Sequence, residues 1–212
     1  MAEPWRVLSE DPDERRLFAA PGAWSGLPSA PAGPRNRLRS VQRVGDDARH
    51  WYVKTFAATQ WKNRLRFVLT APRARDDAER ELGVTLALRE AGSAAPRPVA
   101  CGRDRNGAAY YVCAPLAGEP LADLLRRGAV DDALARRVAA HCGALLRAGF
   151  SLPDLSADHV FVDGETLAVL DLHNGAVTAP GPAPAQLCRR VLRRFARSVR
   201  ELPVPWPAAL RF

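Results

Sequence analysis

Four charged residues follow one another in an order that suits phosphoryl transfer. Lys54 lies near the end of the β-branched and aromatic run His50–Phe56, and Glu81 lies in the apolar-periodic segment that follows. Asp154 stands in a loop that follows a longer apolar-periodic segment, and Asp171 comes shortly after Asp154. Phosphoryl transfer needs a cation on the nucleotide phosphates, a carboxylate that holds a metal ion, and a second carboxylate near the acceptor hydroxyl. A lysine and a glutamate in the first half of the chain are followed by two aspartates in the second half, and this order predicts phosphoryl-transfer chemistry.

Each of the four residues also has an ordinary structural interpretation when it is taken alone. A lysine on a strand is commonly a solvated edge residue, and an aspartate after apolar residues often only forms a turn. Asp77 and Glu79 are also available for the role of Glu81, because they lie in the same segment. The prediction therefore depends on the ordered set and not on any single member.

The use of lysine in this chain gives Lys54 additional weight. Of the 31 lysine and arginine residues, only Lys54 and Lys62 are lysine. Arginine replaces lysine at most surface sites at little cost, but its planar fork cannot replace a compact point charge. We interpret Lys62 as a chance survival and Lys54 as a candidate phosphate ligand.

The hydrophobic pattern predicts an α+β order of elements around these residues. Leucine and valine recur at helical spacing before Gly92, which is a natural helix end. Asp163-Gly164 is a strong hairpin turn, and it separates Asp154 from Asp171 along the chain. The predicted elements are strands at 39–44, 50–56 and 108–114, helices at 76–91, 121–126, 131–148 and 185–200, and a hairpin at 159–170.

These elements divide the chain into three parts. Residues 1–34 are rich in proline and glycine and are predicted to form an irregular N-terminal segment. Residues 35–115 are predicted to form a small β-rich lobe with one helix, which binds the nucleotide. Residues 116–212 are predicted to form a mostly helical lobe that holds the catalytic-loop hairpin, the metal site and a basic C-terminal helix. The segment Trp61–Leu69 is predicted to be a short helix or a linker.

Composition and charge restrict the classes of partner. Hydrophobic residues make up 47% and charged residues 25% of the chain, as in a soluble globular protein. No window is apolar enough for a membrane span, the acidic start excludes a signal peptide, and four scattered cysteines suit a reducing cytoplasm. The net charge of +8 favours a phosphate-rich partner. The predicted C-terminal helix carries many of these charges, namely Arg189, Arg190, Arg193, Arg194, Arg197 and Arg200.

The basic helix has two interpretations that the sequence leaves open. Its arginines either form one solvated face or attract an anionic membrane or a phosphorylated glycolipid, at about 1 kcal/mol per residue near such a surface. Binding of nucleic acid has little support, because aromatic residues do not alternate with arginine on one predicted face.

The chain resembles the lipopolysaccharide core kinases, the Kdo and heptose kinases, whose fold is protein-kinase-like. The residue five positions after Asp154 is His159, where protein kinases have asparagine and these enzymes have histidine. The metal-binding motif is Asp171-Leu172-His173 in place of Asp-Phe-Gly, and the block from Glu81 to Gly92 and its exit also resemble the family. The basic segment Trp61–Arg66 fits as well. The resemblance covers residues 39–177.

The resemblance implies an ATP- and Mg²⁺-dependent kinase that phosphorylates a sugar hydroxyl on a lipopolysaccharide core or a related envelope glycolipid. Lys54 binds the phosphates and Glu81 orients it, while Asp154 positions or deprotonates the acceptor hydroxyl. Asp171 and His159 serve the metal site. Magnesium prefers oxygen ligands, so His159 is expected to act through water or to orient Asp171. The implied location is the cytoplasm, with peripheral contact at the inner membrane face as an open question.

Three departures from the family pattern keep alternatives open. The loop reads Leu152-Pro153-Asp154 in place of His-Arg-Asp, and Gly45 is the only glycine in the turn before Lys54. Few residues follow Asp171, so a truncated C-terminal lobe is expected. A small-molecule or antibiotic kinase of the same fold is one alternative. A catalytically weak pseudokinase that acts as a binding module is the other.

Overall fold

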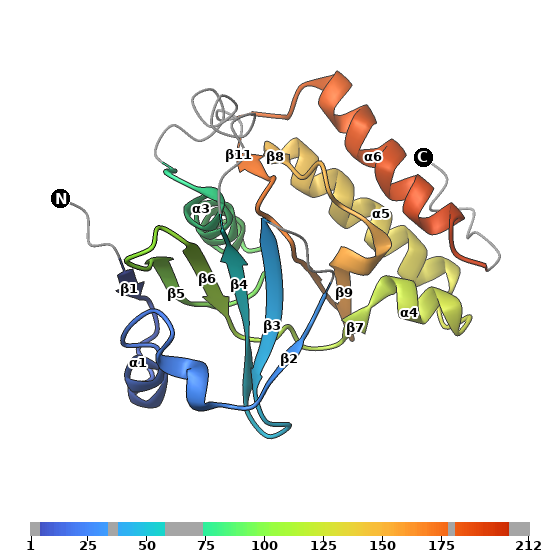
Figure 1. Ribbon diagram of the computed structural model, residues 1–212. Helices are drawn as coiled ribbons and strands as arrows, with labels where there is room; N and C mark the ends of the chain where they lie inside the picture. Colours follow the sequence, from blue (N-terminus) through green and yellow to red (C-terminus); the bar gives the residue numbers. More distant parts are fainter. Residues whose placement is uncertain (1–4, 34–37, 58–73, 178–180, 204–212) are drawn as a thin grey trace. The chain divides into compact units, whose positions relative to one another are not determined.

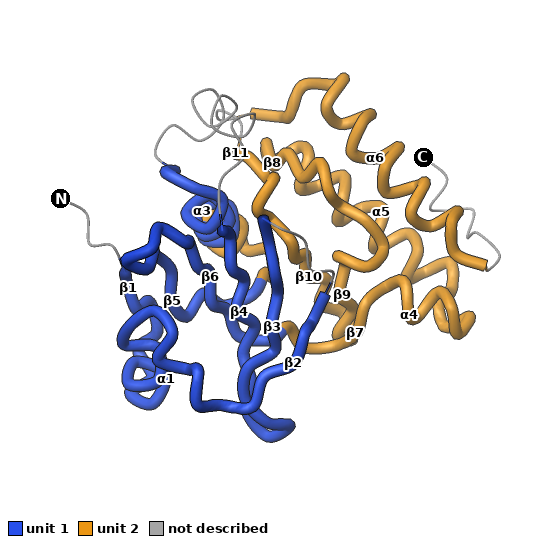
Figure 2. The backbone as a smooth tube through the Cα atoms, viewed as in Figure 1, with its two compact units in different colours: residues 1–86, 96–115 blue, residues 87–95, 116–212 orange. Residues whose placement is uncertain are grey.

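The computed structural model of the chain describes residues 5–33, 38–57, 74–177 and 181–203 (Figure 1). The chain divides into two compact units (Figure 2). Unit 1 comprises residues 1–86 and 96–115, and unit 2 comprises residues 87–95 and 116–212. The α-helices are α1 Pro12–Leu17, α3 Asp77–Glu90, α4 Leu121–Arg126, α5 Asp132–Arg147 and α6 Ala185–Arg200, and the 3₁₀ helices are η1 Ala23–Gly26 and η2 Ala157–His159.

An antiparallel sheet of six strands forms the framework of unit 1. The strands lie in the order β1-β5-β6-β4-β3-β2, so the short strands β1 and β2 form its two edges. The strand that carries Lys54, β4, lies inside the sheet between β6 and β3. The strands are β1 Trp5–Val7, β2 Ser29–Pro31, β3 Arg39–Gly45, β4 His50–Phe56, β5 Pro98–Arg103 and β6 Ala109–Cys113.

Alternation along β4 separates two hydrophobic cores, one on each face of the sheet. Trp51 and Val53 pack into a core with the aromatic residues of the N-terminal segment. Tyr52 and Phe56 pack on the opposite face with residues of α3. Because successive side chains of a strand point to opposite faces, Lys54 shares the α3 face with Tyr52 and Phe56. The pattern of the strand therefore directs the lysine toward the helix that carries Glu81.

The N-terminal segment differs from the sequence-based expectation. Residues 1–34 were predicted to be irregular, but they contain β1, α1, η1 and β2. Phe18 and Trp24 are buried in the core that they form with the sheet. The elements are only three to six residues long, so no hydrophobic period emerges from them. The segment supplies both edge strands and the cover of one sheet face.

A buried carboxylate fastens α1 to the sheet. Glu14 is 2% exposed. It accepts hydrogen bonds from the Ser9 hydroxyl, from Trp51 Nε1 at 2.8 Å, and from both terminal nitrogens of Arg97 at 2.7 and 2.6 Å. The Arg97 guanidinium holds the pKa of Glu14 at about 2, against an ordinary 4.5, and the Ser9 and Trp51 donors act in the same direction. The ionised carboxylate of Glu14 therefore helps to hold the N-terminal segment on the sheet.

The hairpin between β3 and β4 explains the single glycine in the turn before Lys54. Gly45 has φ +111°, and a Cβ atom at this position would lie 2.3 Å from the carbonyl oxygen of Arg49. Only glycine fits this close approach. Gly45 thus has a structural role in closing the turn.

Unit 2 combines the remaining helices with two small sheets. One sheet has the order β10-β9-β7 and the other pairs β11 with β8. Ala94, in the short connection after α3, forms a parallel bridge to Ala168 of β10. The strands of this unit are β7 Glu119–Pro120, β8 Phe150–Ser151, β9 Val160–Asp163, β10 Thr166–Val169 and β11 Ala176–Val177.

Most other elements agree with the predicted ranges, and the predicted α+β fold class is confirmed. The strand at 50–56 and the helices at 121–126 and 185–200 have the predicted bounds. Leu86 is 41% exposed although its spacing matches that of the buried leucines in α3. The predicted helix or linker at Trp61–Leu69 lies outside the described residues. Within the described ranges, no helix has the length and apolar character that a bilayer crossing requires.

Candidate active site

Lys54 and Glu81 form a buried ion pair in unit 1. Lys54 Nζ donates a hydrogen bond to Glu81 Oε1, and the two residues are 6% and 2% exposed. Lys54 lies opposite Val41 of β3 and Tyr111 of β6 in the sheet register. A buried charge is strongly destabilising without a partner, so each of the two charged groups requires the other. The pair is held on rigid elements, a central strand and a helix.

The position of Glu81 on α3 distinguishes it from the acidic neighbours that the sequence also offered. Glu79 lies near the start of the helix, where its Oε2 accepts a hydrogen bond from the backbone N–H of Arg75 at 2.7 Å. Glu81 lies one turn after Ala78, which packs on the sheet. Lys54 forms an ion pair with Glu81, whereas the Glu79 carboxylate binds the backbone at the start of the helix.

Two hydroxyl groups support the turn of α3 that carries Glu81. The Thr85 hydroxyl donates to the backbone carbonyl of Glu81 at 2.7 Å, and the Tyr111 hydroxyl donates to Thr85 Oγ1 at 3.3 Å. Burial raises the pKa of Tyr111 well above 10, so this phenol stays a donor. Among the described residues, Oε2 of Glu81 is buried without a hydrogen-bond partner. This oxygen can accept a further donor or contribute to a cation site.

In unit 2, Asp154 stands in the loop between β8 and η2. Leu152 and Leu155, on either side of it, are buried and anchor the loop. The Asp154 side chain between them is 20% exposed. The altered sequence Leu152-Pro153-Asp154 thus provides an apolar anchor in place of a polar one and still leaves the carboxylate accessible.

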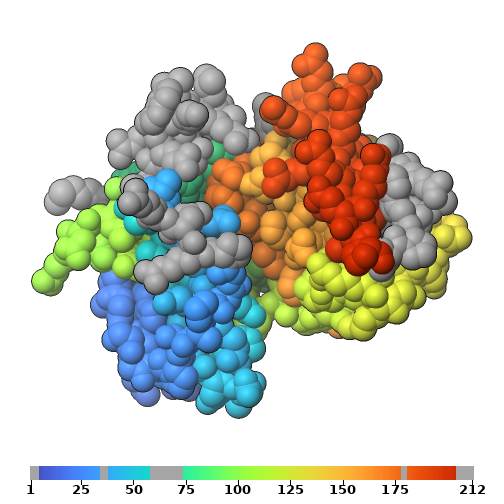
Figure 3. All heavy atoms as spheres, turned by 45° about the vertical axis from the view of Figure 1, so that its right-hand side comes forward, coloured from blue at the N-terminus to red at the C-terminus, as the bar shows by residue number. Residues whose placement is uncertain are grey.

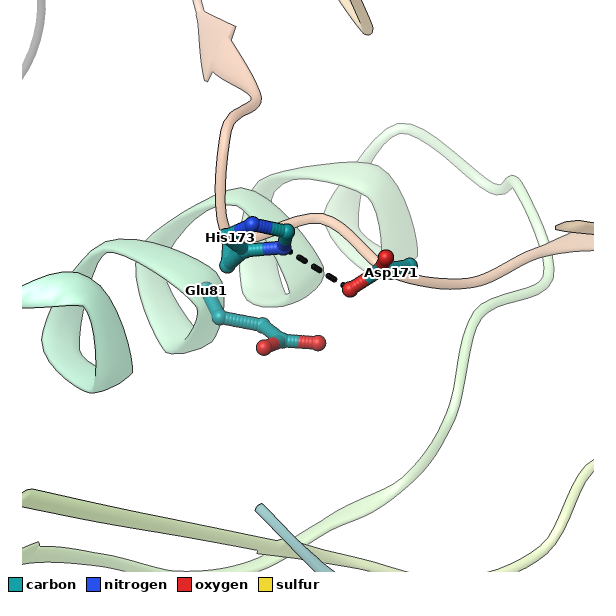
Figure 4. A group of neighbouring side chains, drawn as sticks. All are labelled: Glu81, Asp171 and His173. Atoms are coloured by element: carbon teal, nitrogen blue, oxygen red, sulfur yellow. Dashed lines mark hydrogen bonds and ion pairs between the residues drawn. The ribbon is translucent and has the colours of Figure 1, made fainter. Parts of the chain in front are cut away.

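Asp171 has an unusual backbone conformation. Its φ is +62°, and it is the one non-glycine residue with positive φ in the described part of the chain. A residue with a Cβ atom is disfavoured in this region, and such strain is found mainly where a site requires it. The next residue, Leu172, is 2% exposed and fixes the loop after β10. The side chain of Asp171 points toward His173, to which a dashed line joins it in Figure 4.

A continuous chain of hydrogen bonds connects the two aspartates within unit 2. His173 Nδ1 lies 2.8 Å from Asp171 Oδ1, and His173 Nε2 lies 2.9 Å from Nδ2 of Asn174. The same Asn174 nitrogen donates to Asp154 Oδ2. The order of groups is carboxylate, imidazole, amide, carboxylate.

His159 is hydrogen-bonded to the backbone of Asp154 and lies near the side chain of Asp171. Its Nδ1 lies 2.8 Å from the backbone carbonyl oxygen of Asp154. A carbonyl only accepts, so Nδ1 carries the proton, and in neutral His159 the lone pair lies on Nε2. This Nε2 is 3.8 Å from Asp171 Oδ2, which is too far for a hydrogen bond. In its neutral form, His159 therefore directs the lone pair of Nε2 toward Asp171 Oδ2, whereas His173 contacts Oδ1.

The donor set around Asp171 fits a divalent cation. Carboxylate oxygen is the ligand that Mg²⁺ prefers, and the 2.8 Å contact with His173 is made by Asp171 Oδ1 and not by Oδ2. Two ligand atoms 3.8 Å apart, as Asp171 Oδ2 and His159 Nε2 are, can both contact one ion or its bound water. The residues present thus suit the metal that the sequence analysis expected.

Asn174 and Arg194 were not among the predicted site residues. Asn174 follows the Asp-Leu-His motif directly, so the polar run Asp171 to Asn174 was a visible local signal. Arg194 Nη2 lies 3.2 Å from Asp154 Oδ1. No sequence signal distinguishes this arginine from the others on α6, because the contact joins residues that are far apart along the chain.

The basic residues of α6 are exposed as a group. Figure 3 shows the helix on the surface of unit 2. Val191, Phe195 and Val199 are fully buried and hold its inner face. The exposed residues are Arg189, Arg190, Arg193, Arg194, Arg197 and Arg200.

The chain is similar in fold to proteins of known structure. The structure described as "WaaP in complex with acyl carrier protein" has a TM-score of 0.66 and 21% sequence identity, and the match covers 93% of this chain and 82% of that one. The structure of vaccinia related kinase 3 has a TM-score of 0.47 and 15% identity over 89% of this chain and 69% of that one. No curated protein matches the sequence.

The fold class is that of the protein-kinase-like phosphotransferases, with a sheet-based unit followed by a mainly helical one. The sequence matches the lipopolysaccharide kinase (Kdo/WaaP) family over residues 29–205, which is most of the chain. The chain belongs to this family, and the resemblance inferred from its motifs is confirmed. It is therefore a kinase, as the sequence predicted.

Proposed function

We propose that the protein transfers the γ-phosphoryl group of ATP to a sugar hydroxyl of a lipopolysaccharide core or a related envelope glycolipid. The observation that carries the proposal is the hydrogen-bonded connection between Asp154 and Asp171. It joins one carboxylate suited to a metal ion and one suited to a hydroxyl group, and phosphoryl transfer needs both. The membership of the family supplies the acceptor class.

Lys54 and Glu81 are proposed to hold the nucleotide phosphates. A compact ammonium group suits the α- and β-phosphates, and the Glu81 carboxylate fixes its position. The burial of the pair supports this role, because burial leaves the ammonium few alternative positions.

Asp171 is proposed to hold Mg²⁺, with His159 acting through a bound water or orienting the carboxylate. When bound, the ion would neutralise the charge on the phosphates. The hydrogen bond from His173 fixes one oxygen of Asp171, so the other oxygen has a defined direction. Asp154 is proposed to accept the proton of the attacking sugar hydroxyl or to position that hydroxyl.

The direct test is turnover of ATP with and without a purified acceptor. The full chain with ATP and Mg²⁺ is expected to transfer labelled phosphate to lipopolysaccharide core glycolipid. Transfer to free sugars or aminoglycosides alone would favour the small-molecule kinase of the same fold. Binding of ATP without transfer to any of these acceptors would contradict the proposal.

The two aspartates are expected to fail in different ways. Asp171→Asn removes a charge that the divalent ion needs, so Mg²⁺-dependent ATP binding should weaken strongly. Asp154→Asn should leave ATP affinity within a few-fold but lower turnover by roughly 10²–10⁴, the usual cost of losing a general base. Calorimetry with ATP and Mg²⁺, beside single-turnover rates, measures both effects.

The opposite pattern of results in the two variants would contradict this prediction. If Asp154→Asn loses ATP binding and Asp171→Asn keeps it, the proposed roles are reversed. If neither variant changes binding or turnover, the proposed site is wrong.

The location and the membrane contact are part of the same proposal. ATP is available in the cytoplasm, so we propose that the protein works there on the inner membrane face. The exposed arginines of α6 support contact with anionic lipid, to which each basic residue can add about 1 kcal/mol. Sedimentation with anionic and with neutral vesicles tests this contact, and equal binding to both would contradict it.

A further inference from the structure

The carboxylate of Asp154 is held by two side chains that come from different parts of unit 2. Asn174 donates to Oδ2 from the loop after β10, and Arg194 contacts Oδ1 at 3.2 Å from α6. These are the side-chain partners of Asp154 in the described ranges 5–33, 38–57, 74–177 and 181–203. Each carboxylate oxygen therefore has its own donor, and the plane of the carboxylate is defined from both sides.

Donor and acceptor requirements fix the orientation of Asn174. Asp171 accepts from His173 Nδ1–H, so Nε2 of neutral His173 is an acceptor. The amide nitrogen of Asn174 has two hydrogens, one for His173 Nε2 and one for Asp154 Oδ2. A flipped amide would set its oxygen against two acceptors. Asparagine is thus the residue type that satisfies both neighbours.

We propose that Asn174 and Arg194 are positioning residues that orient the Asp154 carboxylate toward the acceptor hydroxyl. This inference rests on the proposed role of Asp154. Through Arg194, helix α6 takes part in the reaction, and its exposed arginines also form a basic surface. Arg194 is 56% exposed on its side chain. Exposed ion pairs contribute little to folding stability, so an effect of Arg194 on turnover is not expected to come from unfolding.

The test of Arg194 uses its neighbour as a matched control. Arg193 lies on the same helix, is also exposed, and has no ion pair with the residues that the structure describes. Arg193→Ala and Arg194→Ala remove the same charge from α6. We expect kcat of Arg194→Ala to fall about 10- to 100-fold below that of Arg193→Ala, the usual effect of a misplaced reacting group. Equal losses would show that Arg194 acts only through the charge of the helix.

The test of Asn174 uses an isosteric change. Asn174→Asp replaces the donor with an oxygen that faces Asp154 Oδ2 and His173 Nε2. We expect kcat to fall by about 10²-fold while the KM for ATP changes less than about threefold. Should this variant not fold, Asn174→Ala takes its place, with thermal melting as the check. Normal kcat in a folded Asn174→Ala would overturn the assignment of Asn174.

A double-mutant cycle distinguishes positioning from a general structural effect. If Asn174 and Arg194 act through Asp154, their substitutions should lower turnover in the wild-type background and change it less than about twofold in Asp154→Asn. Losses of the same size in both backgrounds would overturn the proposal. A wild-type chain that does not phosphorylate the glycolipid would overturn both the proposed function and this inference. An active wild type with unaffected variants would overturn the inference alone.

Discussion

Lys54 gives the sharpest prediction at the scale of a single residue. It is a lysine in an arginine-rich chain, and it is buried against Glu81. Arginine keeps the charge, but its planar fork needs more room and directs its donors differently. Lys54→Arg is therefore expected to lose kcat/KM nearly as completely as Lys54→Ala. Steady-state kinetics on both variants, with thermal melting to confirm folding, measures the loss.

The same two variants also give the result that would contradict the proposed role of Lys54. Near-normal kcat/KM in Lys54→Arg would show that a positive charge alone is sufficient and that Lys54 is not the phosphate ligand. A large loss in Lys54→Ala together with a normal melting temperature would separate the catalytic role from the role in packing.

Residue type and spacing identified part of the candidate site from the sequence. Lys54 lies on a strand that its β-branched and aromatic residues identify, and Glu81 lies on a helix with a visible period, so their pairing could be predicted. The order of Asp154 and Asp171 around a hairpin was equally visible. Arg194 was not identifiable as a site residue, because its contact with Asp154 depends on how α6 packs in unit 2. Packing between distant segments has no local signal.

At the scale of elements, α1 depends on the ionised state of Glu14. Its pKa is lowered from 4.5 to about 2 in the folded chain. A depressed carboxyl pKa stabilises the fold above the unfolded value, and this contribution disappears as pH falls through the folded value. The shift corresponds to about 3 kcal/mol at neutral pH. Glu14→Gln should therefore melt well below the wild type at neutral pH, and the difference should shrink between pH 4.5 and pH 2.

Asp13→Asn is the control for Glu14, because Asp13 lies next to it in α1 and is exposed. Thermal or denaturant unfolding from neutral pH down to about pH 2 on all three chains measures the effect. We expect Asp13→Asn to follow the wild type within about 0.5 kcal/mol, as exposed ion pairs contribute little. A pH-independent difference for Glu14→Gln would show that its charge is not the cause.

A stabilising substitution is expected at Gly83 in α3. It lies in the interior of the helix, is exposed, and a Cβ atom there would have no neighbour within 4 Å. Glycine inside a helix costs roughly 0.5–1 kcal/mol relative to alanine. Gly83→Ala is expected to raise the free energy of unfolding by about this amount, measured by urea denaturation. Gly45→Ala is the opposite control, because the added Cβ would lie 2.3 Å from a carbonyl oxygen. A Gly83→Ala chain less stable than the wild type would contradict this prediction.

Long periodic elements could be predicted from the sequence, and short ones could not. The strand His50–Phe56 is dense in β-branched and aromatic residues, and the helix Ala185–Arg200 shows a clear helix period. The N-terminal elements β1 and β2 are much shorter and pair with distant strands. Their formation depends on the sheet that they join, so the sequence suggested an irregular segment. Trp5, Phe18 and Trp24 were the available signal for buried structure there.

At the scale of the whole molecule, the N-terminal segment that covers one face of the sheet determines how a shortened chain would behave. The family match begins at residue 29, so β1, α1 and η1 lie before it. A chain cut to residues 29–212 would leave β5 as an open sheet edge and would expose the apolar face that contains Trp51, Val53 and Val112. Open edges and bare apolar faces promote self-association of sheets.

We therefore expect the shortened chain to aggregate, although it keeps every proposed site residue. Light scattering and size-exclusion chromatography of both chains at equal concentration would measure this, and a monodisperse, cooperatively melting 29–212 chain would contradict it. The segment before the family match then acts as a built-in solubility element. Substitutions in it would change the yield of usable protein, while the rate constant of each correctly folded molecule would stay the same.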